Sequence, residues 1–222
     1  MFKAVIFDMD GLLIDSESMT FKGYKKVCRQ YEYIFEDEFY FQFLGSNIEY
    51  MRQGFEARYG QAFPFERILD QVHTEIEKAF ESDGIPLKPG ALNLLEHLKE
   101  QSIKIGLATS SSRDRVDAII AKADIASYFD ATVCGDEITR SKPDPEIFLT
   151  ACQKLEVTPC EALVLEDSEN GIRGAFDGKI TCIHVPDLIP SSKAIQERAA
   201  YIAKDLNEII SWLNMQNTLQ IK

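Results

Sequence analysis

Short apolar runs recur along the chain, and longer segments with apolar residues at every third or fourth position separate them. Five of these runs are rich in β-branched residues and are predicted to be strands: 3–8, 103–109, 131–135, 162–167 and 179–185. Their apolar residues do not alternate with polar ones. Both faces of each strand should therefore be buried, as in a parallel sheet covered by helices on both sides.

Helices are predicted between these strands. Segment 112–125 has Val116, Ile119 and Ile120 at helical spacing, and segment 144–157 opens with the Asp-Pro pair typical of a helix start. Because strands alternate with helices, the pattern predicts a doubly wound α/β fold built on a parallel sheet, as in Rossmann-like cores.

One long segment, between the first and second strands, contains no good strand. This segment is predicted to form several helices, and it is too long to be a loop within a compact domain. We therefore predict an inserted α-helical domain at 15–84 and an α/β core domain formed by 1–14 and 85–222. The aromatic-rich run at 31–45 is interpreted mainly as the interior of the helical domain, and some of its rings are candidates for a substrate pocket.

Composition excludes several classes of function. The chain has 222 residues, 45% of them hydrophobic, and a net charge of −12, which disfavours nucleic acid and anionic membrane surfaces as partners. Five cysteines without a C-x-x-C pair favour reduced thiols. The first apolar run is interrupted by acidic residues, and no run approaches the ~18 residues of a membrane span. A cytoplasmic location is therefore expected. A monomer is also expected, because no long apolar stripe is left over.

Polar residues of particular kinds follow the predicted strands. The clusters are Asp8-Met9-Asp10, Thr109-Ser110-Ser111-Ser112, Ser141-Lys142-Pro143-Asp144-Pro145 and Glu166-Asp167-Ser168. In an open parallel sheet the carboxyl ends of the strands form the binding edge. We therefore expect at least three carboxylates, one ammonium group and several hydroxyls to gather there.

Such a cluster favours a metal ion and phosphoryl chemistry. Asp8 and Asp10 repel each other, and a set of hard oxygen ligands suits Mg²⁺, which retains several waters and shares a substrate phosphate. A carboxylate can act as a nucleophile, and a second carboxyl two residues later can donate and accept protons. Lys142 and the Thr109 hydroxyl can stabilise charge on phosphoryl oxygens.

Four motifs now point to a known family. "FDMDGLLIDSE", "LATSSS", "SKPDPEIF" and "LEDSENGIRGA" resemble the four motifs of the haloacid dehalogenase superfamily. More narrowly, they resemble its phosphatase and β-phosphoglucomutase-like branch, which has a helical cap after the first strand. Each motif alone has a simple structural explanation, such as a helix N-cap or a serine turn. Four motifs in the right order and spacing are specific.

The resemblance implies catalytic and metal-binding roles. Asp8 matches the phosphoryl-accepting nucleophile and a Mg²⁺ ligand. Asp10 matches the general acid/base, whose backbone carbonyl also binds the metal. Asp167 matches a metal ligand, and Glu166 matches an acidic position that binds the metal directly or through water.

Further positions bind phosphate or substrate by the same resemblance. Thr109 and Ser110 match the phosphate-binding hydroxyl and the backbone group that assists it, and Lys142 matches the lysine of the third motif. In the cap, the candidates for contact with substrate are Glu17, Gly45, Ser46 and Asn47.

The reading favours a Mg²⁺-dependent phosphatase acting on a small phosphorylated metabolite, with sugar phosphates as the default. Asp10 favours phosphoryl transfer, because dehalogenases of the superfamily lack an acid there. A phosphomutase like β-phosphoglucomutase is the alternative. That subfamily carries a histidine where this chain has Thr20, and a lysine and an arginine where it has Leu44 and Ile48. A third candidate is a non-enzymatic phospho-switch resembling a receiver domain.

Overall fold

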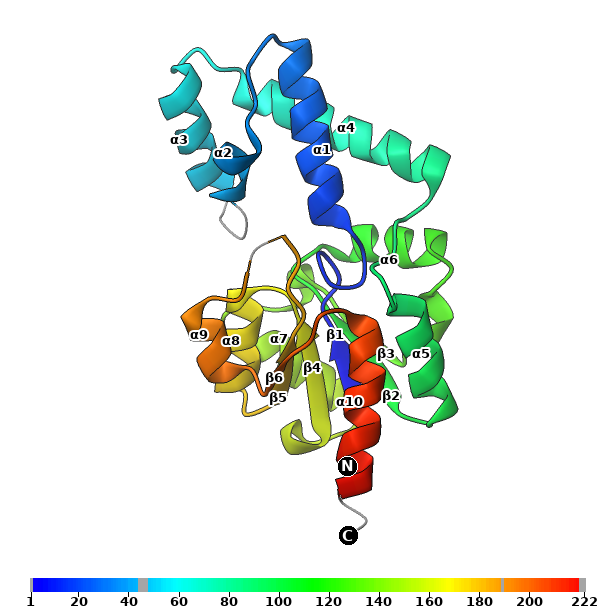
Figure 1. Ribbon diagram of the computed structural model, residues 1–222. Coiled ribbons are helices and arrows are strands. Elements are labelled where there is room, and N and C mark those ends of the chain that lie inside the picture. The colour runs from blue at the N-terminus through cyan, green and yellow to red at the C-terminus, as the bar shows by residue number, and fades with distance from the viewer. Residues whose placement is uncertain (1, 44–47, 189, 220–222) are drawn as a thin grey trace. The chain divides into compact units, whose positions relative to one another are not determined.

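The computed structural model describes residues 2–43, 48–188 and 190–219, with the backbone alone for 217–219. Its contacts divide the chain into two compact units, Met1–Asp15 with Ile85–Lys222 and Ser16–Gly84. The first is called the sheet unit and the second the helical unit (Figure 1). Each is described by itself.

The sheet unit contains a parallel sheet of six strands in the order β3-β2-β1-β4-β5-β6. The strands are β1 (Ala4–Phe7), β2 (Lys104–Ala108), β3 (Ala131–Val133), β4 (Ala162–Glu166), β5 (Thr181–His184) and β6 (Tyr201–Ile202). The predicted fold class is confirmed. The sixth strand was not predicted, because two residues give no pattern.

β1 lies at the centre of this sheet. Ala4 pairs with Lys104 on one side and with Ala162 on the other, and all four residues of β1 are buried. Successive strands step outward from β1 to β3 and then from β4 to β6. The order therefore reverses between β1 and β4, and ligands bind at such a switch point in open α/β sheets.

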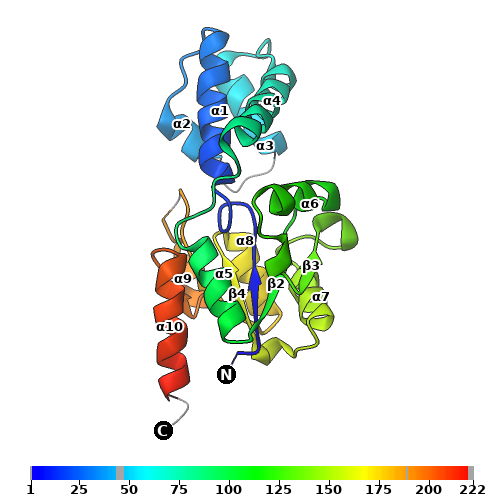
Figure 2. The ribbon, with the colours of Figure 1, turned by 90° about the vertical axis from the view of Figure 1, so that its right-hand side faces the viewer.

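Helices cover both faces of the sheet (Figure 2). α7, α8 and α9 contribute Phe148, Ile172 and Ile195 to one buried cluster with β1 and β4, while α5 contacts β2 and α10 on the other face. The helices are α5 (Ala91–Glu100), α6 (Arg113–Lys122), α7 (Glu146–Lys154), α8 (Glu169–Asp177), α9 (Lys193–Arg198) and α10 (Leu206–Leu219), with 3₁₀ turns η1 (Ala126–Tyr128), η2 (Gly135–Glu137) and η3 (Pro159–Glu161).

Two of these helices are shorter than predicted. α6 and α7 each begin and end one to three residues inside the predicted 112–125 and 144–157. At the start of α7 the Asp144 carboxylate accepts the N–H of Glu146 (3.0 Å), so the Asp-Pro pair lies just before the helix. The residues that cap a helix lie just outside it and have non-helical backbone angles. A prediction from the sequence pattern alone includes them and so makes the helix too long.

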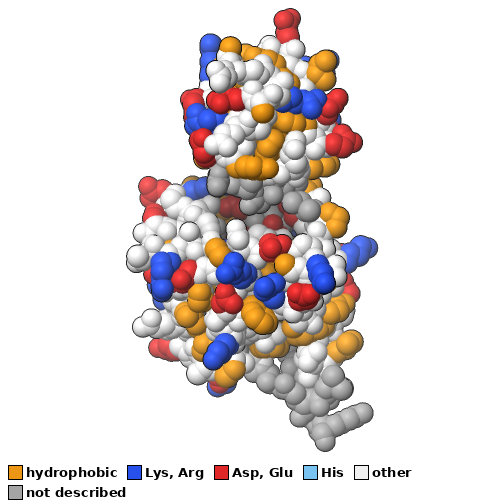
Figure 3. Space-filling model, turned by 90° about the vertical axis from the view of Figure 1, so that its left-hand side faces the viewer, with side chains coloured by type: hydrophobic (Ala, Val, Ile, Leu, Met, Phe, Trp, Pro, Cys, Tyr) orange, Lys and Arg blue, Asp and Glu red, His pale blue; other side chains and the backbone are white. Residues whose placement is uncertain are grey.

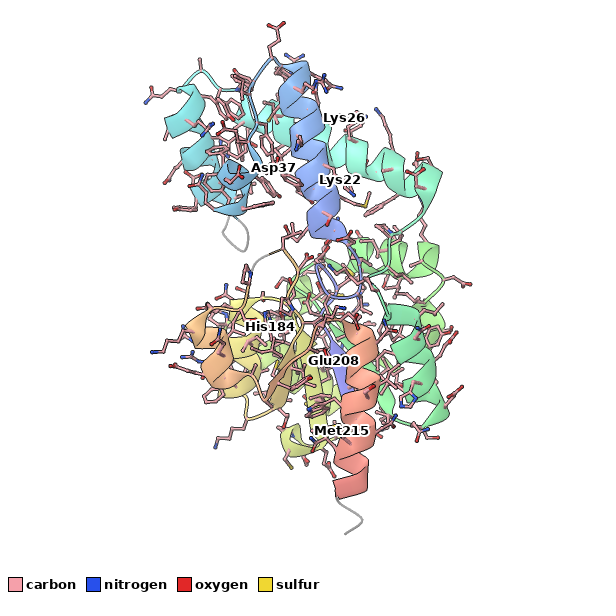
Figure 4. All side chains as sticks on the ribbon, viewed as in Figure 1. Lys22, Lys26, Asp37, His184, Glu208 and Met215 are labelled. Atoms are coloured by element: carbon pink, nitrogen blue, oxygen red, sulfur yellow. The ribbon has the colours of Figure 1, made fainter. Side chains whose placement is uncertain are left out.

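The described residues of the helical unit form four helices around an aromatic interior. They are α1 (Ser16–Gln30), α2 (Asp37–Phe41), α3 (Ile48–Tyr59) and α4 (Phe65–Asp83). Phe55 is fully buried, and the rings of Phe39 and Tyr24 lie 5.0 and 5.6 Å from it. Lys26 of α1 forms an ion pair with Glu75 of α4 on the outside (Figure 4). The core of the helical unit is thus formed by packed aromatic rings and not by a sheet.

The face of the molecule drawn in Figure 3 carries acidic and basic side chains interspersed with hydrophobic ones. No candidate membrane-spanning segment occurs among the described helices.

Candidate active site

Asp8 follows β1 directly, at the edge where the strand order reverses. Its N–H donates to the Leu165 carbonyl oxygen (3.0 Å), which continues the pairing of β1 with β4, and the residue is 7% exposed. Burial raises the pKa of the Asp8 carboxyl to about 7, although the charge of Lys142 acts against this shift. A buried, perturbed carboxyl at a switch point marks a candidate functional site.

The ammonium group of Lys142 contacts residues at the ends of three strands, β1, β2 and β4. Its Nζ lies 2.5 Å from Asp8 Oδ1 and 2.6 Å from Glu166 Oε1, and it donates to the Ala108 carbonyl oxygen at 3.1 Å. Burial alone would lower the pKa of Lys142, but the two carboxylates outweigh burial and raise it. The lysine therefore carries a fixed positive charge in the interior.

Glu166 ends β4 and is fully buried. Besides the contact of Oε1 with Lys142, its Oε2 accepts the N–H (2.8 Å) and the O–H (2.9 Å) of Ser168. The Ser168 hydroxyl oxygen in turn accepts the Gly171 N–H at the start of α8. A Cβ at Gly171 would lie 1.8 Å from Glu166 Oε1, so the first turn of α8 reaches the carboxylate only with glycine there. Protein groups thus hold both oxygens of Glu166.

Asp167 lies beside the turn that follows β1. Gly11 has a φ of +83°, and a Cβ there would lie 2.4 Å from Asp167 Oδ2. Among the residues that the structure describes, the Asp167 carboxylate has no ion pair and no hydrogen bond from a side chain. Burial, with neighbouring carboxylates including Glu166, raises its pKa well above the usual range. Asp167 is therefore a half-buried acid without a cation.

Asp10 points to a different set of partners. Its Oδ2 accepts the Ser111 hydroxyl (2.8 Å), and its Oδ1 lies 2.9 Å from Nη2 of Arg115. Arg115 Nε also donates to Ser111 Oγ at 3.3 Å. The side chains of Ser111 and Arg115 thus fix the position of the Asp10 carboxylate.

Thr109 lies at the end of β2 and is 2% exposed. Its N–H donates to the Val133 carbonyl oxygen (3.1 Å), and its hydroxyl oxygen accepts the Ser111 N–H (3.2 Å). Ser110, the next residue, is exposed. The loop after β2 thus places a fixed hydroxyl next to an exposed serine.

The predicted cap positions belong to the helical unit. Glu17 lies in the first turn of α1, and the Thr20 hydroxyl donates to the Ser16 carbonyl oxygen of the same helix (2.9 Å). Gly45, Ser46 and Asn47 lie outside the described residues, as does Leu44.

His184 lies in β5, where it pairs in register with Glu166 (Figure 4). It is 1% exposed, and its Nδ1 lies 3.2 Å from the Glu166 carbonyl oxygen. Burial lowers the pKa of His184, which favours a neutral ring. A neutral, buried ring inside the sheet is consistent with a structural role for His184.

The donor set fits Mg²⁺ better than a metal held by side chains alone. Within the described part of the chain, no group of three or more His, Cys, Asp or Glu side chains is arranged to hold a metal ion. Glu166 and Asp10 turn their carboxylates toward protein donors. Asp8, Asp167 and the Asp10 carbonyl oxygen remain, and Mg²⁺ typically takes one or two carboxylates together with waters and a substrate phosphate.

Three residues at this edge were not found from the sequence: Arg115, Lys88 and Asp187. Arg115 follows Ser111 by four residues, and this helical spacing was the available signal. Lys88 and Asp187 form an ion pair (2.5 Å) across 99 residues of sequence, and no local pattern indicates such a pair.

A parallel sheet with carboxylates and a lysine at its switch point defines the class of protein. The family model of haloacid dehalogenase-like hydrolases matches residues 5–185. The chain therefore belongs to the haloacid dehalogenase-like hydrolase family, and it is an enzyme of the hydrolase type.

Known relatives match over most of the chain. A phosphorylated carbohydrates phosphatase of Thermotoga maritima is 31% identical over 216 residues, which are 95% of this chain and 98% of the relative. The β-phosphoglucomutase of Bacillus subtilis is 34% identical over 179 residues, 77% of each chain. A crystal structure of a Thermotoga maritima protein superposes with a TM-score of 0.81 at 31% identity and covers 96% of this chain and 99% of that one.

Proposed function

We propose that the protein is a Mg²⁺-dependent phosphatase that hydrolyses a small phosphorylated metabolite, in the first instance a sugar phosphate, through an aspartyl-phosphate intermediate. The observation that carries the proposal is the buried Asp8, held by Lys142 at 2.5 Å beside the uncompensated Asp167. The similarity to a phosphatase of phosphorylated carbohydrates supports the substrate class.

In the first half-reaction, an Asp8 oxygen forms a bond to phosphorus while the bond from phosphorus to the ester oxygen breaks. Asp10 gives its proton to that ester oxygen, so the alcohol leaves uncharged. Thr109, the backbone at Ser110 and Lys142 stabilise the phosphoryl oxygens.

In the second half-reaction, Asp10 accepts a proton from water as the water oxygen attacks phosphorus. The bond between phosphorus and Asp8 breaks, and inorganic phosphate leaves. Asp10 is then protonated again and ready for the next substrate.

Asp8, the Asp10 carbonyl oxygen and Asp167 would hold Mg²⁺. The metal would offset the negative charge of the phosphoryl group and of Asp8. Glu166 was expected to bind the metal directly or through water. We propose instead that it acts through Lys142, because donors within the protein occupy both of its oxygens.

We further propose that the helical unit, with the predicted bounds 15–84, acts as a cap domain that selects the leaving group. Glu17 stays a candidate for contact with substrate. The monomeric state, the cytoplasmic location and the exclusion of nucleic acid and membrane partners stay predictions.

A phosphomutase is the second candidate, because β-phosphoglucomutase of Bacillus subtilis is 34% identical to this chain. The same aspartyl phosphate would then return its phosphoryl group to a sugar. Thr20 favours hydrolysis, since its hydroxyl is bound to its own helix where the mutases carry a histidine.

One assay separates the two candidates. Phosphate release is measured with Mg²⁺ over a panel of phosphorylated metabolites, and β-glucose 1-phosphate is also followed for conversion to glucose 6-phosphate. Release from one or a few compounds supports the phosphatase. Isomerisation without release overturns it in favour of the mutase, and a stable phosphoprotein with no turnover points to the phospho-switch.

A further inference from the structure

Asp187 has a buried oxygen that the protein leaves without a partner. This residue follows β5, and its side chain is 7% exposed. Its Oδ1 lies 2.5 Å from Lys88 Nζ, but its Oδ2 is buried and makes no hydrogen bond to any described residue. Leaving a buried acceptor unsatisfied costs about 1–3 kcal/mol, and more when it is charged. A group that supplies a donor is therefore expected at this oxygen.

Gly11 locates this oxygen relative to the candidate active site. A Cβ on Gly11 would lie 2.4 Å from Asp167 Oδ2 and 3.3 Å from Asp187 Oδ2. Both oxygens thus face the same small space beside the turn that follows β1. Gly11 follows Asp10 directly, so this space adjoins the Asp10 carbonyl oxygen proposed for the metal.

The charges around this space do not balance. Lys142 is shared by Asp8 and Glu166, and Arg115 is held by Asp10. Lys88 is shared by Asp187 and, at 3.7 Å, by Asp15. Each of these cations is thus already in contact with at least one carboxylate, and Asp167 has none among the described residues. A divalent cation beside Asp167 would offset the excess.

A hydrated divalent cation also supplies the donor that Asp187 lacks. Mg²⁺ in proteins keeps several of its waters, and carboxylates beyond the ligands commonly accept hydrogen bonds from them. Asp187 Oδ2 is on the correct side of Gly11 for such a bond, and Lys88 holds the other oxygen in place.

We propose that Asp187, oriented by Lys88, is a positioning residue of the metal site, which binds a water of the Mg²⁺ held at Asp8 and Asp167. The inference rests on the proposed function and deepens it, because it adds a carboxylate from the loop after β5 to a site otherwise built from β1 and β4.

Calorimetric titration of Mg²⁺ into the full-length protein tests this role without turnover. Asp187→Asn keeps the size of the side chain and can still accept a bond from Lys88. It is expected to raise the Mg²⁺ dissociation constant by about 10–100-fold, the usual effect of removing an outer partner. Asp15→Asn is the matched control. It faces the same lysine and also has a buried oxygen without a hydrogen bond, but the atoms nearest to a Cβ on Gly11 belong to Asp167 and Asp187. Its dissociation constant should change by less than about threefold.

A second variant covers the case in which Asp187→Asn does not fold, as judged by thermal unfolding in EDTA. Lys88→Gln removes the anchor of Asp187 and should also weaken Mg²⁺ binding. Unchanged binding in Asp187→Asn, or equal weakening in Asp15→Asn, overturns the inference and leaves the proposed function intact. A wild-type protein that binds no Mg²⁺ overturns the metal-dependent function itself, and the inference with it.

Discussion

Charged side chains meet in the interior of the sheet unit, whereas in the helical unit they pair at the surface. Lys142 and Asp8 lie 2.5 Å apart with side chains 7% and 10% exposed. Lys25 and Asp37 lie 2.7 Å apart with side chains 52% and 42% exposed. The two distances are alike, and the surroundings differ.

This difference in burial shows where the protein gives up folding stability for the sake of its candidate active site. Removing ions from water costs several kcal/mol each, so buried ion pairs are weak contributors to stability, while exposed pairs contribute about 0–1 kcal/mol. The helical unit avoids the cost and fills its interior with rings around Phe55. The sheet unit bears it at the one edge where strand order reverses.

The largest expected effect comes from Asp8→Asn. The amide has nearly the shape of the carboxylate but cannot accept the phosphoryl group, so phosphate release should fall below detection while the thermal unfolding curve keeps its shape. The matched change in the helical unit, Asp37→Asn, should leave turnover intact. Substantial turnover by Asp8→Asn would exclude the covalent mechanism.

Asp10→Asn should come next. Both half-reactions should slow by about 10²–10⁴-fold if this residue transfers protons. The loss in phosphoryl transfer should be smaller with p-nitrophenyl phosphate, because its leaving group needs little protonation. Single-turnover rates on good and poor leaving groups measure this, and equal losses on both would contradict the role.

Phe55→Ala tests the aromatic interior of the helical unit. It empties the centre of the aromatic interior and should lower the free energy of unfolding by about 3–5 kcal/mol. Urea denaturation measures the change, with the partly exposed Phe41→Ala as the control of small effect. Mg²⁺ affinity should stay within about twofold, and a large loss would show that the site depends on the helical interior.

A pH series should show how far Asp8 and Asp167 destabilise the metal-free protein. Burial raises the pKa of Asp8 from 3.8 to about 7 and that of Asp167 well above 3.8, so these groups destabilise the metal-free fold as pH rises through that window. Mg²⁺ binds only after the protons leave. The increase in Tm caused by Mg²⁺ should therefore grow from pH 5 to pH 7.5, with affinity changing by up to about tenfold per pH unit for each proton displaced. A constant increase would argue against these ligands.

The smallest effect is expected for Lys25→Gln. Its partner Asp37 stays in water, so the free energy of unfolding should change by less than about 1 kcal/mol. Urea denaturation at low and high salt would check this. A loss of several kcal/mol would mean that surface charge, and not only the rings, supports the helical unit.

The sheet was predictable because its strands are buried on both faces. Within the predicted strand 162–167, the first four residues are continuously apolar, as expected for a strand covered by helices on both faces, and all of them are buried. β6 was missed because its two residues, Tyr201 and Ile202, are half-buried or exposed and carry no period. It exists only through pairing with β5.

Which residues form the candidate site could be predicted in part from the sequence for the same reason. Residues after strands, such as Asp8 and Thr109, follow once the strands are assigned. The hydrogen-bond partner of each side chain could not be predicted, because Arg115 and Asp10 are 105 residues apart in the sequence and Lys88 and Asp187 are 99 apart. Such pairs depend on tertiary packing, which local pattern does not contain.

The chain leaves and re-enters the sheet unit through two adjacent, hydrogen-bonded segments. The Asp15 N–H donates to the Pro86 carbonyl oxygen (2.9 Å), and the Lys88 N–H donates to that of Leu13 (2.9 Å). These segments form a short antiparallel ribbon, so a tight turn can join 15 to 86 with little change in the catalytic scaffold. The 69 residues of the helical unit, Ser16–Gly84, are in this sense a cassette. Under the proposed cap role, exchanging such a cassette would change which substrates are accepted while Asp8, Asp10 and Lys142 stay in place.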